Sequence, residues 1–151
     1  MILLAYMMIL HFVADFLMQS REMGQKKSSE VIWLLRHLLI QWLMFFVGLS
    51  IVVGPIAAII FATANAVIHG VIDWNIWNCY KLLTHKRLMS KANRAAYMNG
   101  NLNIPFEERA KVKYDEKLAS FKYWEDHLFY STIGFDQLLH CLTIITLFSI
   151  L

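Results

Sequence analysis

Four apolar segments of roughly membrane-spanning length constrain the fold of this chain more than any other feature. They cover residues 1–18, 31–53, 56–80 and 128–151. A helix needs about 20 residues to cross the hydrocarbon core of a bilayer, and each segment is near that length. The chain is 58% hydrophobic and 17% charged, whereas a soluble domain has about 45–50% apolar and about 25% charged residues. We therefore expect an all-α integral membrane protein, folded as a single membrane domain over residues 1–151.

A hydrophilic insert, residues 81–127, separates the third and fourth segments. Its first part can continue the third helix, until a stretch rich in Asn and Gly before Pro105 breaks the helical pattern. Beyond Pro105, apolar residues recur at helical spacing with charges between them, which predicts an amphipathic helix running to about Trp124. The predicted fold is a four-transmembrane-helix bundle with a helical hairpin insert between helices 3 and 4.

The basic residues predict the orientation of this bundle. Ten of the fourteen lysines and arginines lie between Lys81 and Lys122, and the other four lie in or beside the link between the first two segments. With four spans, both regions are on one side, and the positive-inside rule makes that side the cytoplasm. We expect a cytoplasmic insert, with both termini on the outer side of an inner or plasma membrane. Lys26 and Lys27 are interpreted as orientation charges, with a contact to an anionic substrate group as the alternative.

Three of the apolar segments each contain one aspartate and one histidine four residues apart. The pairs are His11 with Asp15, His69 with Asp73 and, in reverse order, Asp136 with His140. On a helix, this spacing places both side chains on one face. Ionisable residues are costly in an apolar span, so they face a bundle interior, pair with each other or bind a ligand. Three such pairs predict a shared polar site inside the bundle.

The predicted topology brings these residues into one layer. Counted at 1.5 Å per residue, the three pairs and His37 of the second segment lie about 6–18 Å from the cytoplasmic ends of their helices. Carboxylates and imidazoles are ligands for zinc, manganese and iron. We predict a divalent metal site, with zinc as the first choice and manganese or iron as alternatives. The predicted ligands are His11, Asp15, His37, His69, Asp73, Asp136 and His140.

A metal with an open position would lower the pKa of a bound water and supply a hydroxide nucleophile. The predicted function is therefore a metal-dependent hydrolase acting on a lipid-linked or membrane-proximal substrate near the cytoplasmic leaflet. Asp15 is predicted to be a ligand or general base, and His37 a ligand or proton shuttle. Gln19, Asn65 and Gln137 are interpreted as amides that orient ligands or join helices.

Other functions use the same residues. Each aspartate could hold its own histidine by a hydrogen bond and help to pack the helices, or the side chains could form a proton or ion path. The alternative function is thus a non-catalytic membrane protein. It would be either a small ion or metal transporter or an interaction protein whose basic insert docks a cytoplasmic partner. The outer halves of the spans are almost entirely apolar, which argues against a continuous path.

The insert combines its ten basic residues with six acidic ones. That balance is weak for binding a phosphate backbone, so we expect no nucleic-acid partner. Membrane lipids are the expected partners, with anionic headgroups in contact with the insert. A homo-oligomer is a further expectation, because four spans of modest length could need a second copy to enclose a site. His85 and His127 are predicted to be surface residues.

The combined motifs resemble one known family. They are His11-Phe-Val-Ala-Asp15-Phe-Leu-Met-Gln19, Lys27-Ser28, His37, His69-Gly-Val-Ile-Asp73 and Asp136-Gln137-Leu-Leu-His140. This pattern resembles the uncharacterised bacterial and phage membrane proteins grouped as domain of unknown function 3307. The resemblance covers all four spans but hardly the insert, and the Asp-Gln-x-x-His element is its most specific part. It implies no established activity, and the likeness to membrane-bound metal-dependent hydrolases is one of general type.

Overall fold

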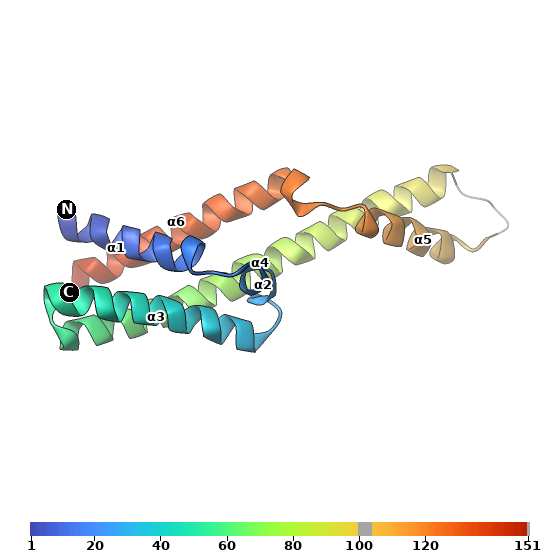
Figure 1. Cartoon of the computed structure of the whole chain (residues 1–151). Coiled ribbons are helices and arrows are strands. Elements are labelled where there is room, and N and C mark those ends of the chain that lie inside the picture. Colours follow the sequence, from blue (N-terminus) through green and yellow to red (C-terminus); the bar gives the residue numbers. More distant parts are fainter. Residues whose placement is uncertain (100–103, 151) are drawn as a thin grey trace. The chain divides into compact units, whose positions relative to one another are not determined.

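The computed structural model describes residues 1–99 and 104–150, and every regular element in those ranges is a helix (Figure 1). The elements are α1 (Ile2–Phe12), the π-helix η1 (Val13–Leu17), α2 (Arg21–Lys26), α3 (Val31–Val53), α4 (Pro55–Asn99), α5 (Phe106–Ala119), the 3₁₀-helix η2 (Tyr123–Glu125) and α6 (His127–Ile150). The predicted all-α fold class is confirmed.

Three helices in the described part of the chain are long and apolar enough to span a membrane. They are Val31–Val53, Pro55–Met98 and His127–Ile150. The 23 residues of the first extend about 35 Å, more than the hydrocarbon thickness of about 30 Å. A shorter apolar helix, Ile2–Leu17, combines α1 and η1. These lengths and compositions indicate that the protein is associated with a membrane.

The connection between α3 and α4 is a tight turn at Gly54 and Pro55. Gly54 has a φ of 85°, a conformation that glycine adopts without the steric cost of a side chain. Pro55 is the first residue of α4, where its missing N–H is not needed for the helix and its fixed φ is suitable. The two helices therefore run antiparallel beside one another (Figure 1).

The chain divides into two compact units. Unit 1 is Met1–Asn78 with Ile133–Leu151, and unit 2 is Cys79–Thr132. The apolar core of unit 1 takes residues from α1, α3, α4 and α6. They are Met7, Leu10, Phe45, Leu49, Ala58, Phe61, Ala62 and Ile144. The start of α1, the α3–α4 turn and the end of α6 lie at the same end of this unit (Figure 1).

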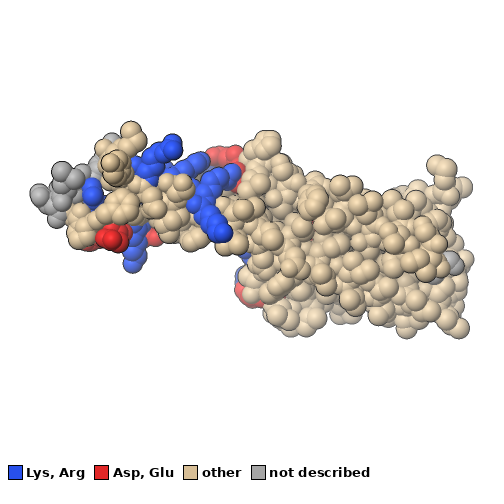
Figure 2. Space-filling view, turned by 180° about the vertical axis from the view of Figure 1, so that it is seen from behind, with Lys and Arg blue, Asp and Glu red and all other residues tan. Residues whose placement is uncertain are grey.

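Unit 2 carries most of the charge of the protein. Figure 2 shows lysine and arginine side chains gathered on it, whereas the visible face of unit 1 is almost uncharged. Within unit 2, Asp126 accepts hydrogen bonds from Arg87 at 2.5 Å and from the Tyr80 hydroxyl at 3.4 Å. His85 and His127 are exposed, as predicted.

The helix that follows Pro105 is shorter than predicted. It was expected to reach Trp124 but ends at Ala119. The Ser120 hydroxyl donates to the carbonyl oxygens of Glu116 at 3.0 Å and Lys117 at 3.2 Å. Carbonyls in the last turn of a helix lack partners within the helix, and the serine satisfies two of them.

The link between the first two apolar segments contains a helix that the sequence analysis did not predict. The Ser20 hydroxyl accepts a hydrogen bond from the Met23 backbone N–H at 3.2 Å and caps α2. Met23 is buried, and so are Lys27 and Ser28 directly after the helix. The polar link therefore folds against the apolar segments of unit 1 and brings a lysine into its interior.

Candidate metal site

All seven predicted ligands are buried inside unit 1, each no more than 3% exposed. The exposed fractions are His11 3%, Asp15 3%, His37 0%, His69 1%, Asp73 0%, Asp136 2% and His140 2%. They come from α1, η1, α3, α4 and α6. The structure therefore brings together in one interior the residues that the sequence places in four separate apolar segments.

Asp15 reaches this interior from the π-helix η1. There the chain makes a wider turn, seen in the hydrogen bond from the Met18 N–H to the Val13 carbonyl at 3.0 Å. Such turns are rare and are frequent at functional sites. Asp15 Oδ1 lies 3.1 Å from His37 Nε2 on α3. The carboxylate thus pairs with a histidine of another helix.

His37 and His69 meet because α3 and α4 pack antiparallel in a fixed register. Their Nε2 atoms lie 2.9 Å apart. Two helical turns further along each helix, the Phe45 and Phe61 rings pack with centroids 5.3 Å apart. Because the two helices run in opposite directions, a move of four residues forward along α3 corresponds to four residues back along α4. This register also places Gln41 opposite Asn65, between the histidine pair and the phenylalanine pair.

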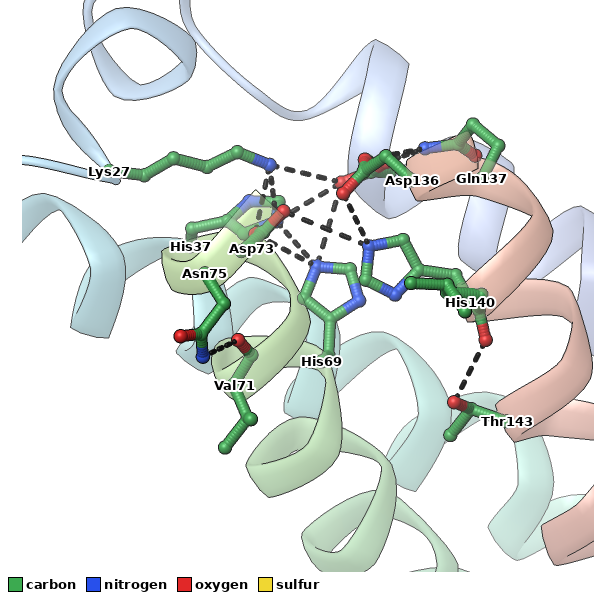
Figure 3. A network of polar contacts seen from close by, with 12 residues as sticks. Lys27, His37, His69, Val71, Asp73, Asn75, Asp136, Gln137, His140 and Thr143 are labelled. Atoms are coloured by element: carbon green, nitrogen blue, oxygen red, sulfur yellow. Dashed lines mark hydrogen bonds and ion pairs between the residues drawn. The ribbon is translucent and has the colours of Figure 1, made fainter. Parts of the chain in front are cut away.

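Four ligand atoms, from Asp15, His37, His69 and Asp73, lie close to one another, and Figure 3 shows three of these residues, His37, His69 and Asp73. Asp73 Oδ2 lies 3.3 Å from His37 Nε2 and 3.2 Å from His69 Nε2. Asp15 Oδ1 lies 3.1 Å from His37 Nε2 and 3.7 Å from His69 Nε2. The two histidine nitrogens lie 2.9 Å apart. Ligand atoms at about 2.0–2.2 Å from a tetrahedral zinc ion lie about 3.3–3.6 Å apart. Two overlapping groups of three residues, Asp15 with His37 and His69 and His69 with Asp73 and His140, are compact enough to hold an ion.

His140 and Asp136 lie on the other side of Asp73. His140 Nε2 is 3.7 Å from Asp73 Oδ1 and 3.6 Å from Asp136 Oδ1. The His140 ring stacks on that of His69, with centroids 3.9 Å apart and an angle of 18° between the planes. His11 packs beside both, with its ring centroid 5.1 Å from that of His140 and 5.5 Å from that of His69.

The residue that sequence reasoning missed is Lys27. It was interpreted as an orientation charge, but its Nζ lies 2.9 Å from Asp73 Oδ2, 3.4 Å from His37 Nε2 and 3.7 Å from Asp15 Oδ1 (Figure 3). Burial alone would lower the pKa of this ammonium group, but the nearby carboxylates of Asp73 and Asp15 outweigh that effect and raise the pKa. Lys27 is therefore a charged member of the cluster. The signal that could have found it is the Lys27-Ser28 element of the family resemblance.

Lys26 differs sharply from its neighbour. Its side chain is 44% exposed and makes an ion pair with Glu30 at 3.9 Å. Its Nζ also lies 5.4 Å from the centre of the Trp33 ring. The interpretation as a surface charge therefore suits Lys26 and not Lys27.

Amide side chains surround the cluster. Gln137 Nε2 donates to Asp15 Oδ2 at 2.7 Å and lies 3.4 Å from Asp136 Oδ2, so it joins two carboxylates from different helices. Gln41 and Asn65 are 0% and 2% exposed. Both amide atoms of Gln41 and the Nδ2 of Asn65 have no hydrogen-bond partner in the described part of the chain. Gln41 is a further buried polar residue that the sequence analysis did not single out.

The fixed charges of the cluster do not balance. Asp15, Asp73 and Asp136 contribute three negative charges and Lys27 one positive charge, which leaves about two negative charges if the imidazoles are neutral. Buried charges need a partner, because their desolvation is costly. One divalent cation supplies the missing charge, and the oxygen and nitrogen donors present are suitable ligands for zinc, manganese or iron. The arrangement can thus hold a metal ion.

Comparison with models of known protein families gives a match over most of the chain. A model of the family described as "Protein of unknown function (DUF3307)" matches residues 3–99. The matched range contains five of the seven predicted ligands and Lys27, and ends before Asp136 and His140. Neither a curated protein nor a solved structure matches the chain.

Proposed function

This chain belongs to the DUF3307 family, and we propose that it is a four-span membrane protein that binds a divalent metal ion through its buried histidines and aspartates. We further propose that it is a metal-dependent hydrolase acting on a lipid-linked or membrane-proximal substrate near the cytoplasmic leaflet. The metal is zinc by first choice, with manganese or iron as alternatives.

The observation that carries metal binding is the convergence of four ligand atoms from three different elements. Asp15 Oδ1, His37 Nε2, His69 Nε2 and Asp73 Oδ2 lie between 2.9 and 3.7 Å from one another over the five measured pairs. Two imidazole nitrogens and two carboxylate oxygens without a thiolate form a donor set that suits zinc and also accepts manganese or iron. Packing alone does not require polar atoms from three elements to lie this close together.

The position of the cluster supports a site near one membrane surface. His37 is the seventh residue of α3 and so lies about 9 Å from the start of that helix. The opposite end of unit 1 holds the start of α1, the α3–α4 turn and the end of α6 (Figure 1), a set of sequences free of lysine and arginine. With Ile2–Leu17 as the fourth span, the positive-inside rule makes the end nearer His37 cytoplasmic.

Hydrolysis is the reaction class that this site would support. A bound divalent ion lowers the pKa of a coordinated water and polarises an ester or phosphoester bond. One water is consumed: its oxygen bonds to the carbonyl carbon or phosphorus, the bond to the leaving oxygen breaks, and the leaving oxygen receives a proton. Asp15 is either a metal ligand or the proposed proton acceptor: Gln137 holds its Oδ2 at 2.7 Å while its Oδ1 faces the histidines. His37 is either a metal ligand through Nε2 or a proton shuttle between Asp15 Oδ1 and Lys27 Nζ, which both face that nitrogen.

A second candidate function is a proton-handling network without a metal. It is favoured by the short contacts that the chain makes within the cluster, Lys27 Nζ to Asp73 Oδ2 at 2.9 Å and His37 Nε2 to His69 Nε2 at 2.9 Å. A lysine, two histidines and two carboxylates in contact could pass protons among themselves. The two functions differ in whether the folded protein retains a metal.

Elemental mass spectrometry on the purified protein in mild detergent separates them. The wild type is supplied with Zn²⁺, Mn²⁺ or Fe²⁺ and freed of excess ion by gel filtration. We expect stoichiometric metal in the wild type and in the control variant His85→Gln, and a reduced metal content in His37→Gln and Asp73→Asn. Folded wild-type protein that retains no metal would overturn the metal function and leave the proton network.

The proposed hydrolase activity is tested in a separate experiment. Metal-loaded and metal-free wild-type protein are compared on lipid-linked diphosphate, phosphomonoester and carboxylic ester substrates in detergent micelles. We expect cleavage of one class by the loaded protein alone, and none by Asp15→Asn. Equal rates with and without metal, or no cleavage of any class by the loaded protein, would refute the proposed reaction.

A further inference from the structure

On the basis of the proposed metal binding, we infer that unit 1 holds a two-metal centre in which Asp73 bridges the two ions. Two overlapping groups of potential ligands occur among the described residues, Asp15 with His37 and His69, and His69 with Asp73 and His140. A single ion cannot take all seven buried histidines and aspartates, since zinc binds about four ligands. Two ions can.

The bridging role follows from the two carboxylate oxygens of Asp73. Its Oδ2 faces His37 and His69 at 3.3 and 3.2 Å. Its Oδ1 faces His140 Nε2 at 3.7 Å. A carboxylate that presents one oxygen to each of two ligand sets has the arrangement needed to bind two ions at once.

The second position is formed by Asp73 Oδ1, Asp136 Oδ1 and His140 Nε2. None of these atoms has a hydrogen-bond partner in the described structure, and their separations of 3.6 and 3.7 Å are too long for hydrogen bonds. Two ligands bound at about 2.1 Å lie about 3.0–3.6 Å apart when the angle between them is 90–120°. The distances therefore suit two ligands of one ion better than a direct contact.

His11 is a further imidazole beside this second set. It is 3% exposed, and neither of its ring nitrogens has a hydrogen-bond partner in the described part of the chain. Its ring centroid lies 5.1 Å from that of His140. His69 is already used by the first ion, so His11 is the remaining imidazole for the second. The first ion then takes its ligands from Asp15, His37 and His69, the second takes its ligands from Asp136, His140 and His11, and Asp73 presents one oxygen to each ion.

The His69 and His140 rings lie side by side where the two sets meet. The His69 and His140 rings are nearly parallel, with 3.9 Å between their centroids and 18° between their planes. In two-metal hydrolytic sites, the ions lie about 3.5–4 Å apart. Stacked imidazoles at this distance can each direct one nitrogen to a separate ion.

The charge of such a centre indicates the class of substrate. With neutral imidazoles, the carboxylates and Lys27 leave about two negative charges, and two dications would convert these to about two positive charges. An anionic substrate group is then favoured over a neutral ester. Because two-metal sites stabilise both the attacking and leaving oxygens of a phosphoryl centre, the expected substrate is a phosphate ester or diphosphate.

Metal counting tests the inference. The protein is saturated with Mn²⁺ and analysed for metal per chain and by electron paramagnetic resonance. We expect two ions per chain and an exchange-coupled spectrum in the wild type and in His85→Gln. His140→Gln and Asp136→Asn should each retain one ion with the spectrum of isolated Mn²⁺, and His37→Gln should retain one ion in the other position. Gel filtration and thermal unfolding identify any variant that fails to fold, and His11→Gln then replaces it.

The outcomes separate this inference from the metal function on which it rests. No metal in the folded wild type would refute both. One ion per chain, or two ions with an uncoupled spectrum, would overturn the bridged centre and leave metal binding intact. Orthophosphate is the probe for the substrate class: we expect it to alter the coupled spectrum of the wild type, and an unchanged spectrum at millimolar phosphate would contradict an anionic substrate.

Discussion

Lys27 Nζ lies 2.9 Å from Asp73 Oδ2, the same oxygen that faces His37 and His69. The lysine is only 4% exposed, so its ammonium and a metal ion would share the charge of one carboxylate in a site away from water. Like charges in such a setting repel strongly. Lys27 therefore stabilises the carboxylates when no metal is bound and opposes the metal when it is.

Replacing Lys27 with methionine should tighten metal binding. We expect Lys27→Met to lower the dissociation constant by about tenfold or more, which is about 1.4 kcal/mol, and to lower the thermal stability of the metal-free protein because the carboxylates lose their partner. Competition with a chromophoric chelator measures the affinity. Lys26→Met is the matched control and should change neither quantity, since Lys26 is half exposed. Weaker metal binding by Lys27→Met would show that the ammonium holds the ligands in place.

Gln137 should matter to the metal through Asp15. Its Nε2 donates to Asp15 Oδ2 at 2.7 Å and so fixes the orientation of the carboxylate. Loss of a partner that orients a ligand typically costs about 10–100-fold in metal affinity. We expect that loss for Gln137→Ala, and none for Leu138→Ala at the next, exposed position of α6. Equal affinities of the two variants, measured by the same chelator competition, would rule out this role.

Gly48 allows α1 to approach α3. A Cβ at this position would lie 2.6 Å from Leu10 Cδ1 and 3.1 Å from the Tyr6 hydroxyl, which donates to the Gly48 carbonyl at 3.2 Å. We expect Gly48→Ala to destabilise the protein by about 1–3 kcal/mol, because the crowded side chains must move. Gly134→Ala is the control, since its Cβ would meet nothing within 4 Å and alanine favours a helix. Unfolding in detergent monitored by circular dichroism compares them, and a loss of similar size at both positions would contradict close packing at Gly48.

The pairing of Asp126 with Arg87 should make unit 2 sensitive to acid. Burial would raise the pKa of Asp126, but the hydrogen bond from Arg87 at 2.5 Å outweighs it and lowers the pKa. Because the pKa is lower in the folded state, the stabilisation is complete above the ordinary aspartate value of about 3.9 and is lost as the pH falls through the lower folded value.

Asp126→Asn should therefore be less stable than the wild type at pH 7, and the difference should shrink as the pH falls below about 4. Thermal unfolding across a pH series provides the measurement. Glu125→Gln serves as the control at an exposed neighbouring carboxylate and should show no such convergence. If the difference in thermal stability between Asp126→Asn and the wild type stays constant down to pH 3, the stabilisation does not depend on the charge of Asp126.

The sequence by itself determined the helices and the faces that carry the polar residues. An apolar run of about 20 residues forms a helix in a membrane, since every backbone N–H and C=O must be hydrogen-bonded within the segment. A spacing of four residues placed His69 with Asp73, and Asp136 with His140, on common faces, and the structure keeps these pairs 3.2 and 3.6 Å apart. Gly54 and Pro55 likewise defined the α3–α4 turn, because both have strong local conformational preferences.

Only the tertiary structure decided which helices share ligands. Asp15 meets His37 of α3 because η1 winds as a wider turn and α1 packs beside α3, and neither feature has a local sequence signal as strong as a four-residue spacing. Lys27 enters the cluster because α2 folds against the apolar segments, although the composition of the link is that of an exposed loop. Asp73 lies between two histidine sets because α3 and α6 pack on different sides of α4. Local spacing fixes the face of one helix, whereas the register and packing between helices depend on side-chain contacts far apart in the sequence.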